Sequence, residues 1–194
     1  STALTNRRWR LARRPQGEIA AGDLAFTTVP VPALAQGEVL VRNIYLSLDP
    51  THRIWMSDQD QYLPPVEIGA VMRGGGIGVV EDTRSERFAR GDIVSVGLGG
   101  WEDFTVASER QLGRVRRLDG VPLTAHLCVL GSTGLTAWYG MVDIGQPKAG
   151  ETVVVSAAAG AVGSIAGQLA KRRGARVVGI AGGAAKCRWL VDDL

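Results

Sequence analysis

The feature of this chain that most constrains its fold is a glycine-bearing turn between an apolar run and a helical segment. Residues 152–156 are continuous and mostly β-branched, as expected of a parallel strand buried on both faces. After the turn, residues 164–173 repeat apolar side chains at helical spacing and end in basic residues. A second β-branched run at 175–181 precedes the start of another helix at 184–194. This order of strand, helix, strand and helix predicts a right-handed parallel βαβ unit.

The turn itself predicts a dinucleotide-binding site. Such a turn brings backbone N–H groups to a pyrophosphate at a helix N-terminus, where the peptide dipoles favour negative charge. We expect Gly160 to permit the close approach and Gly163 to let the helix pack against its strand. The alternative is a run of small residues that serves helix packing alone and binds no ligand. The turn reads Ala158-Ala159-Gly160-Ala161-Val162-Gly163, the G-x-G-x-x-G pattern with alanine at its first glycine.

The end of the second predicted strand indicates which nucleotide is bound. A site for NAD usually places Asp or Glu about 20 residues beyond the glycines, where the acid accepts the ribose hydroxyls. Here the strand ends Ile180-Ala181-Gly182-Gly183, and Lys186 lies in the following turn. A lysine beside free N–H groups at a helix start suits a phosphate dianion, so we expect NADP with Lys186 on the 2′-phosphate. The alternative is an ordinary solvated lysine.

The first 120 or so residues are patterned differently. Short β-rich runs at 37–46, 74–81, 91–96 and 103–106 are separated by turn residues, as in an all-β barrel or sandwich. Residues 124–141 have helix-compatible spacings interrupted by glycines. We therefore expect a mixed fold, with a β-rich domain over 1–123 and the first part of a Rossmann α/β domain over 124–194.

Composition excludes several classes of protein. No run approaches the roughly 18 apolar residues of a membrane helix, and we expect a cytoplasmic protein. Cys128 and Cys187 are far apart, which argues against a disulfide framework. The net charge of +3 comes from scattered arginines without a nucleic-acid-binding motif. His52 and His126 lie far from either cysteine, so we expect no metal site.

Four segments together resemble one family over essentially the whole chain, in order and in spacing. The family is the group of prostaglandin reductases, plant double-bond reductases and bacterial curcumin reductases, a zinc-free branch of the medium-chain dehydrogenases/reductases. The segments are Leu46-Ser47-Leu48-Asp49-Pro50, Tyr62-Leu63-Pro64-Pro65-Val66 with Val71-Met72-Arg73-Gly74-Gly75-Gly76, Gly131-Ser132-Thr133-Gly134-Leu135-Thr136-Ala137, and Ala157-Ala158-Ala159-Gly160-Ala161-Val162-Gly163-Ser164.

The resemblance implies a GroES-like barrel beside a Rossmann domain, and a homodimer as the complete enzyme. It implies hydride transfer from NADPH to the β-carbon of an α,β-unsaturated ketone or aldehyde, without zinc. Positions matching the family's cofactor contacts are Thr136 near the nicotinamide, residues 160–163 on the pyrophosphate, and Lys186 on the 2′-phosphate. The sequence departs from the family at Thr51-His52, where a tyrosine is frequent, and at Ser132, where methionine is common.

Two other functions stay open at this point. One is a quinone oxidoreductase of the same superfamily, and the other is a non-catalytic NADPH-binding fragment. Only two strands of the six in a Rossmann sheet precede Leu194, so we expect this sequence to be part of a longer enzyme. The catalytic acid would then lie beyond Leu194, and we assign no catalytic residue within the chain. Taken alone, the two strands should leave Val153, Val155, Val177 and Ile180 partly exposed.

Overall fold

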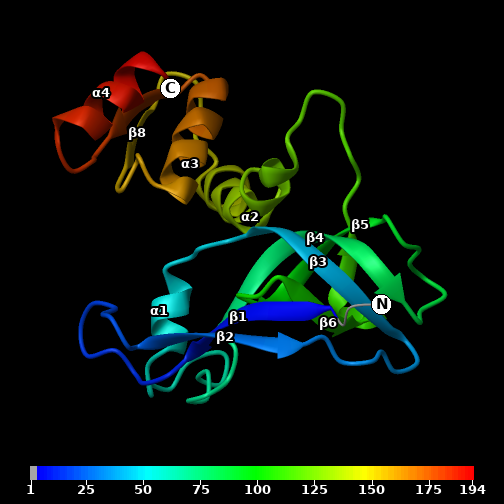
Figure 1. The fold of residues 1–194 in the computed structure, drawn as a ribbon. Coiled ribbons are helices and arrows are strands. Elements are labelled where there is room, and N and C mark those ends of the chain that lie inside the picture. Colours follow the sequence, from blue (N-terminus) through cyan, green and yellow to red (C-terminus); the bar gives the residue numbers. More distant parts are fainter. Residues whose placement is uncertain (1–3) are drawn as a thin grey trace. The chain divides into compact units, whose positions relative to one another are not determined.

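The chain folds into two compact units, Ser1–Leu118 and Asp119–Leu194. A computed structural model describes residues 4–194. The sequence placed the domain boundary between residues 123 and 124, a few residues after the division in the structure. Figure 1 colours the first unit from blue to green and the second from yellow-green to red. Among the helices of the described residues, none has the length and apolar character needed to cross a membrane.

A curled antiparallel sheet of five strands forms the body of the first unit, which confirms its predicted β-rich character. Its strands bury a common core of mostly valine side chains, because alternate residues of each strand face the same side. A β-carbon on Gly78 would lie 2.4 Å from Val41 Cγ1, so glycine is needed where β3 and β4 approach closely. The sheet has the order β6-β3-β4-β5-β7 and comprises β3 Glu38–Leu46, β4 Arg73–Thr83, β5 Ile93–Gly100, β6 Phe104–Ser108 and β7 Leu112–Arg114.

A separate hairpin of β1 Thr5–Leu11 and β2 Leu24–Pro30 was not anticipated from the sequence. Main-chain hydrogen bonds tie β1 to two other segments of the unit. Trp9 N–H donates to the carbonyl of Trp101 at 2.8 Å, and Met72 N–H donates to the carbonyl of Trp9 at 2.8 Å. The hairpin covers a second core cluster that includes Leu11, Trp55, Met56, Val66 and Met72.

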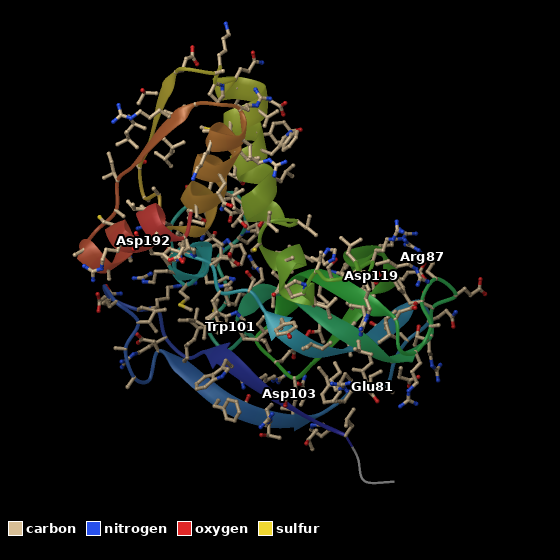
Figure 2. The ribbon with its side chains drawn as sticks, turned by 90° about the horizontal axis from the view of Figure 1, so that it is seen from above. Glu81, Arg87, Trp101, Asp103, Asp119 and Asp192 are labelled. Atoms are coloured by element: carbon tan, nitrogen blue, oxygen red, sulfur yellow. The ribbon has the colours of Figure 1, made fainter. Side chains whose placement is uncertain are left out.

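The remaining elements of the first unit are short. Helix α1, Thr51–Trp55, begins directly after Pro50, whose ring restricts φ to values that suit a helix start. A 3-10 turn, η1 Glu109–Gln111, connects β6 to β7 and carries a capping box between Ser108 and Gln111. Trp101 and Asp103, labelled in Figure 2, lie on the segment between β5 and β6.

The second unit contains the predicted βαβ arrangement. Strands β8 and β9 are parallel and in register, with Val153 opposite Val177. Helix α3 begins at Ala161, directly after Gly160, and so starts earlier than the periodicity of residues 164–173 suggested. The elements are η2 Leu123–Leu127, α2 Ser132–Trp138, the π-helical segment η3 Tyr139–Gly145, β8 Thr152–Val155, α3 Ala161–Arg172, β9 Arg176–Gly179 and α4 Ala184–Asp192.

The two faces of the β8–β9 pair differ in burial. Val155 is 8% exposed and packs with residues of α2 and α3, so its expected exposure was wrong. Val153 and Val177 are half-buried on the same face, and Ile180 is 57% exposed as expected. On the other face Val154 is 62% exposed. Helices therefore cover one face of the pair, and the opposite face presents apolar side chains.

Candidate dinucleotide-binding edge

The carboxyl ends of β8 and β9 meet at one edge of the second unit, because the two strands are parallel. Ile180 N–H donates to the carbonyl of Val155 at 2.9 Å, and Ala158 N–H donates to the carbonyl of Ile180 at 3.0 Å. These two bonds extend the pairing beyond the regular strands and fix the turn after β8. We refer to this region, residues 156–163 and 180–186, as the nucleotide edge.

The turn of the nucleotide edge ends at Gly160, the residue before helix α3. Gly160 has φ −85° and ψ 172°, and its N–H donates to the carbonyl of Ala157 at 2.8 Å. Ser164 N–H bonds the carbonyl of Gly160 at 2.9 Å, which closes the first turn of the helix. The N–H groups of residues 161–163 therefore point out of the helix start without an intrahelical acceptor. Such groups together with the helix dipole can bind an anion.

Gly163 lies where the first turn of α3 passes closest to the preceding loop. A β-carbon at this position would lie 2.4 Å from the carbonyl oxygen of Ala157 and 2.9 Å from the Cα of Ala158. Both neighbours are backbone atoms, which cannot move aside as a flexible side chain can. At Gly160 the same construction gives 3.1 Å to the Ala157 oxygen, a less severe contact. Gly163 is thus the stricter requirement of the pair.

Lys186 lies in the first turn of α4, at the same edge of the sheet. Gly183, with φ 83°, precedes the helix, and Cys187 N–H donates to its carbonyl at 3.2 Å. The Lys186 side chain is exposed, and the first turn of α4, within the described chain, holds no acidic residue. The topology therefore brings a cation and a second helix start to the edge that carries the glycine turn.

Thr136 belongs to α2 of the same unit. Its hydroxyl donates to the carbonyl of Ser132 at 2.8 Å, which leaves the oxygen lone pairs available. The next residue, Ala137, packs in one cluster with Val155 and Ala158. Helix α2 packs against α3, so the structure places Thr136 beside the helix-to-strand packing of this unit.

Sequence reasoning missed two special positions, one in the nucleotide edge and one directly before its second segment. Ala157 has φ +47°, a left-handed conformation that non-glycine residues rarely adopt, and nothing in its side chain signals this. Gly179 ends β9, where a β-carbon would lie 2.9 Å from Ala158 Cβ and 3.1 Å from Leu190 Cδ1. A glycine at the end of a β-branched run was the available signal for that close approach.

A cavity of about 340 Å³ lies along α3 and α4 and shares only Gly163 with the predicted cofactor residues. Its other walls include Gln168, Lys171 and Val191, which lie further along the two helices. Of the predicted cofactor residues, Ala161, Val162 and Lys186 do not line this cavity, and they lie at the carboxyl ends of the strands. We therefore place the candidate site at the nucleotide edge and not in this cavity.

Potential metal ligands do not gather in the described part of the chain. No group of three or more His, Cys, Asp or Glu side chains close enough to hold an ion occurs among residues 4–194. Cys128 and Cys187 are both free thiols. His52 is buried in the first unit, with Asp49 as its nearest acidic neighbour at 3.9 Å.

Comparison with known proteins bears on both units. Residues 7–115 match the family described as the N-terminal domain of oxidoreductase. The chain is 46% identical over 189 residues to NADPH-dependent curcumin reductase of Escherichia coli, covering 97% of this chain and 54% of that protein. It is 39% identical over 184 residues to prostaglandin reductase 1 of Bos taurus, covering 94% and 54%. The chain spans about half the length of these relatives.

Solved structures extend the likeness to the fold of both parts. The crystal structure of CurA from Vibrio vulnificus in complex with NADPH is 43% identical, with a TM-score of 0.87, covering 96% of this chain and 55% of that one. A quinone oxidoreductase of Pseudomonas syringae is 26% identical, with a TM-score of 0.68, covering 97% and 56%. The match over 7–115 and these relatives show that the chain belongs to the medium-chain dehydrogenase/reductase family, in the group of the prostaglandin and curcumin reductases.

Proposed function

We propose that this chain binds NADPH at its nucleotide edge and that the protein carrying it reduces the C=C bond of α,β-unsaturated ketones or aldehydes. The observation that carries the proposal is the backbone approach at Gly163, 2.4 Å from the Ala157 oxygen for any β-carbon, beside the free N–H groups of α3. Glycine is needed at position 163 because α3 starts so close to the preceding turn that a side chain would not fit. The resulting cradle fits a pyrophosphate.

Three parts of the chain have separate roles in the proposed binding. The N–H groups of Ala161, Val162 and Gly163 would donate to pyrophosphate oxygens, while Gly160 leaves room for the phosphate to approach. Lys186 would form an ion pair with the 2′-phosphate, which is absent from NADH. Thr136 would offer its hydroxyl oxygen toward the nicotinamide end.

Bound NADPH supplies the hydride, and the residues of this chain supply its placement. Binding that fixes the cofactor on rigid elements lowers the entropic part of the reaction barrier, because the reacting groups no longer have to find each other. The nucleotide edge is built on two paired strands and two helix starts, all tied by main-chain bonds. We assign no proton-donating residue within the chain, in keeping with the expectation from the sequence.

The proposal includes independence from zinc. A catalytic zinc site needs three protein ligands of the His, Cys or carboxylate type, and residues 4–194 provide no such group. We expect the natural polypeptide that carries this chain to keep its activity after exhaustive chelation. Stoichiometric zinc in the purified active protein, lost together with activity, would contradict this part.

A quinone reductase is the second candidate, supported by the likeness to the Pseudomonas syringae quinone oxidoreductase. The decisive experiment measures NADPH oxidation by the natural polypeptide with an enone and with a quinone, each followed by product analysis. We expect a higher kcat/KM for the enone and a saturated ketone as product. A preference for the quinone would favour the second candidate, and NADPH binding without turnover of either would favour a non-catalytic role.

A further inference from the structure

His52 is an enclosed imidazole in the first unit. It is 4% exposed, and its ring centroid lies 5.2 Å from that of Trp55 and 5.3 Å from that of Trp101. Strand β4 closes the third side at Gly74, where a β-carbon would lie 3.4 Å from His52 Nε2 and 2.7 Å from Trp101 Nε1. The ring is therefore held between α1, the segment before β6 and a glycine that has no room for a side chain.

The hydrogen bonding of His52 specifies a neutral ring. Asp49 N–H donates to His52 Nδ1 at 3.1 Å, so the proton of the neutral imidazole is on Nε2. In addition, the backbone N–H of His52 donates to the carbonyl of Asp49 at 2.9 Å. The two hydrogen bonds together close the turn that precedes α1. Protonation would put an N–H on Nδ1 directly against the Asp49 N–H. Two donors would then face each other, and a charge would be enclosed among indole rings.

The charges around the ring do not compensate that cost. Burial lowers the pKa of the His52 imidazole below its ordinary value, and the Asp49 carboxylate opposes that shift in part. Arg73, stacked over the Trp55 ring at 5.3 Å, is a further cation near the cluster. His52 Nε2 has no hydrogen-bond partner among residues 4–194. The ionisable side chains on α1 and the turn before it, at the start of β4 and on the segment before β6 are Asp49, Arg53, Arg73, Glu102 and Asp103.

We propose that His52 is a pH-sensitive latch on helix α1: the neutral ring holds the turn at 49–52 closed, and protonation opens it. The inference is independent of the proposed cofactor and substrate. The closed turn keeps an exposed polar contact in place at the surface of the first unit. Thr51, next to His52, shares a hydrogen bond of 2.5 Å with the hydroxyl of Tyr62, and the Tyr62 ring contacts Trp55 edge-on at 6.5 Å. Opening of the turn therefore moves Thr51 and breaks its hydrogen bond with Tyr62.

The sign of the effect follows from the direction of the shift. A histidine whose pKa is lower when folded adds stability that is fully present above its unfolded value of about 6.5. That stability is lost as the pH falls through the lower folded value. Between the two values, one linked proton makes the open turn about tenfold more populated for each pH unit of acidification.

The test is hydrogen exchange of the natural polypeptide between about pH 7.5 and about pH 4.5, corrected for intrinsic exchange and followed by mass spectrometry. Peptides that cover 49–56 report on the latch, and peptides from β3 and β4 report on the sheet. The variant is His52→Asn, because the asparagine side-chain oxygen can accept the Asp49 N–H without titrating. The matched control is His126→Asn, at the only other histidine of the chain.

We expect wild type and His126→Asn to lose protection at 49–56 below about pH 6.5, by about tenfold per pH unit, while His52→Asn changes far less. The same pH profile in His52→Asn, or no pH dependence in wild type, would overturn the proposal, as would simultaneous loss in β3 and β4. If His52→Asn does not fold, His52→Gln takes its place, and titration of the wild-type His52 ring by NMR decides. A midpoint at or above about 6.5 would then contradict the latch.

Discussion

A β-carbon built on Gly163 would lie 2.4 Å from the carbonyl oxygen of Ala157, far inside the closest normal contact. This relationship ties the start of α3 to the turn after β8. It allows the helix start to lie close to the strand end, so that its N–H groups face the space beyond the sheet. The geometry of the nucleotide edge therefore depends on the absence of one side chain.

Gly163→Ala should destabilise the protein and weaken NADPH binding. Overpacking against backbone atoms costs about 1–3 kcal/mol, because the helix start must shift to relieve the contact. Urea unfolding and NADPH fluorescence titration measure the two effects. Gly140→Ala is the control, since a β-carbon there meets nothing within 4 Å; we expect it to be neutral or slightly stabilising. Unchanged stability and affinity in Gly163→Ala would contradict the tight start of α3.

Ala157→Gly should stabilise the folded chain. A left-handed conformation costs a non-glycine residue about 1–2 kcal/mol, and the extra freedom of glycine when unfolded offsets about 0.5–1 kcal/mol of that gain. The net expectation is a gain of about 0.5–1 kcal/mol in the free energy of unfolding. Ala159→Gly, two residues on and without positive φ, should instead lose stability. Destabilisation by both changes would show that Ala157 is not strained.

The βαβ unit could be predicted from sequence because two strong signals coincide there. β-branched runs mark the strands, and glycines at fixed spacing mark the turn. What could not be predicted is the left-handed backbone of Ala157, since the strain comes from pairing Ala158 with Ile180 rather than from local preference. The placement of Lys186 at the same edge follows from parallel pairing alone, and its role stays a prediction.

The first unit was predicted less completely. Strand β1 was missed because Arg8 and Arg10 occupy half-buried positions where apolar residues would give an alternating pattern. Arg10 is accommodated there by donating to the carbonyl of Gly69, a partner distant in sequence. Helix α1 was missed because its five residues are too few for a periodic signal. The enclosure of His52 could not be predicted, because its aromatic neighbour Trp101 comes from a distant segment.

Glu102 provides a test of the polar contacts that attach β1. Burial raises the pKa of its carboxyl, while hydrogen bonds from Asn6 at 2.9 Å and Thr105 at 3.1 Å oppose the shift. Because the folded state holds the proton more tightly than the unfolded one, this group makes stability fall as the pH rises from its ordinary 4.5 through the raised value. Glu102→Gln removes that dependence.

Urea unfolding at about pH 4.5 and about pH 7 measures the Glu102 effect. The stability of Glu102→Gln relative to wild type should increase between the two values, whereas Glu67→Gln, at an exposed position, should show no such trend. Asp103, whose pKa is lowered by its hydrogen bond with Arg7, acts in the opposite direction in both proteins and cancels in the difference. A relative stability that falls with rising pH would contradict the assignment.

We propose above that NADPH binds at the nucleotide edge with Lys186 on its 2′-phosphate. The most direct measurement is the Kd of NADPH and of NADH for wild type, Lys186→Ala and the control Lys148→Ala, at one ionic strength. A charge-assisted phosphate contact is worth about 1.5–3 kcal/mol, so Lys186→Ala should weaken NADPH by about 10- to 150-fold. NADH affinity, and both affinities of Lys148→Ala, should stay within about twofold of wild type. Equal losses for NADPH and NADH in Lys186→Ala, or no loss for either, would contradict the claim.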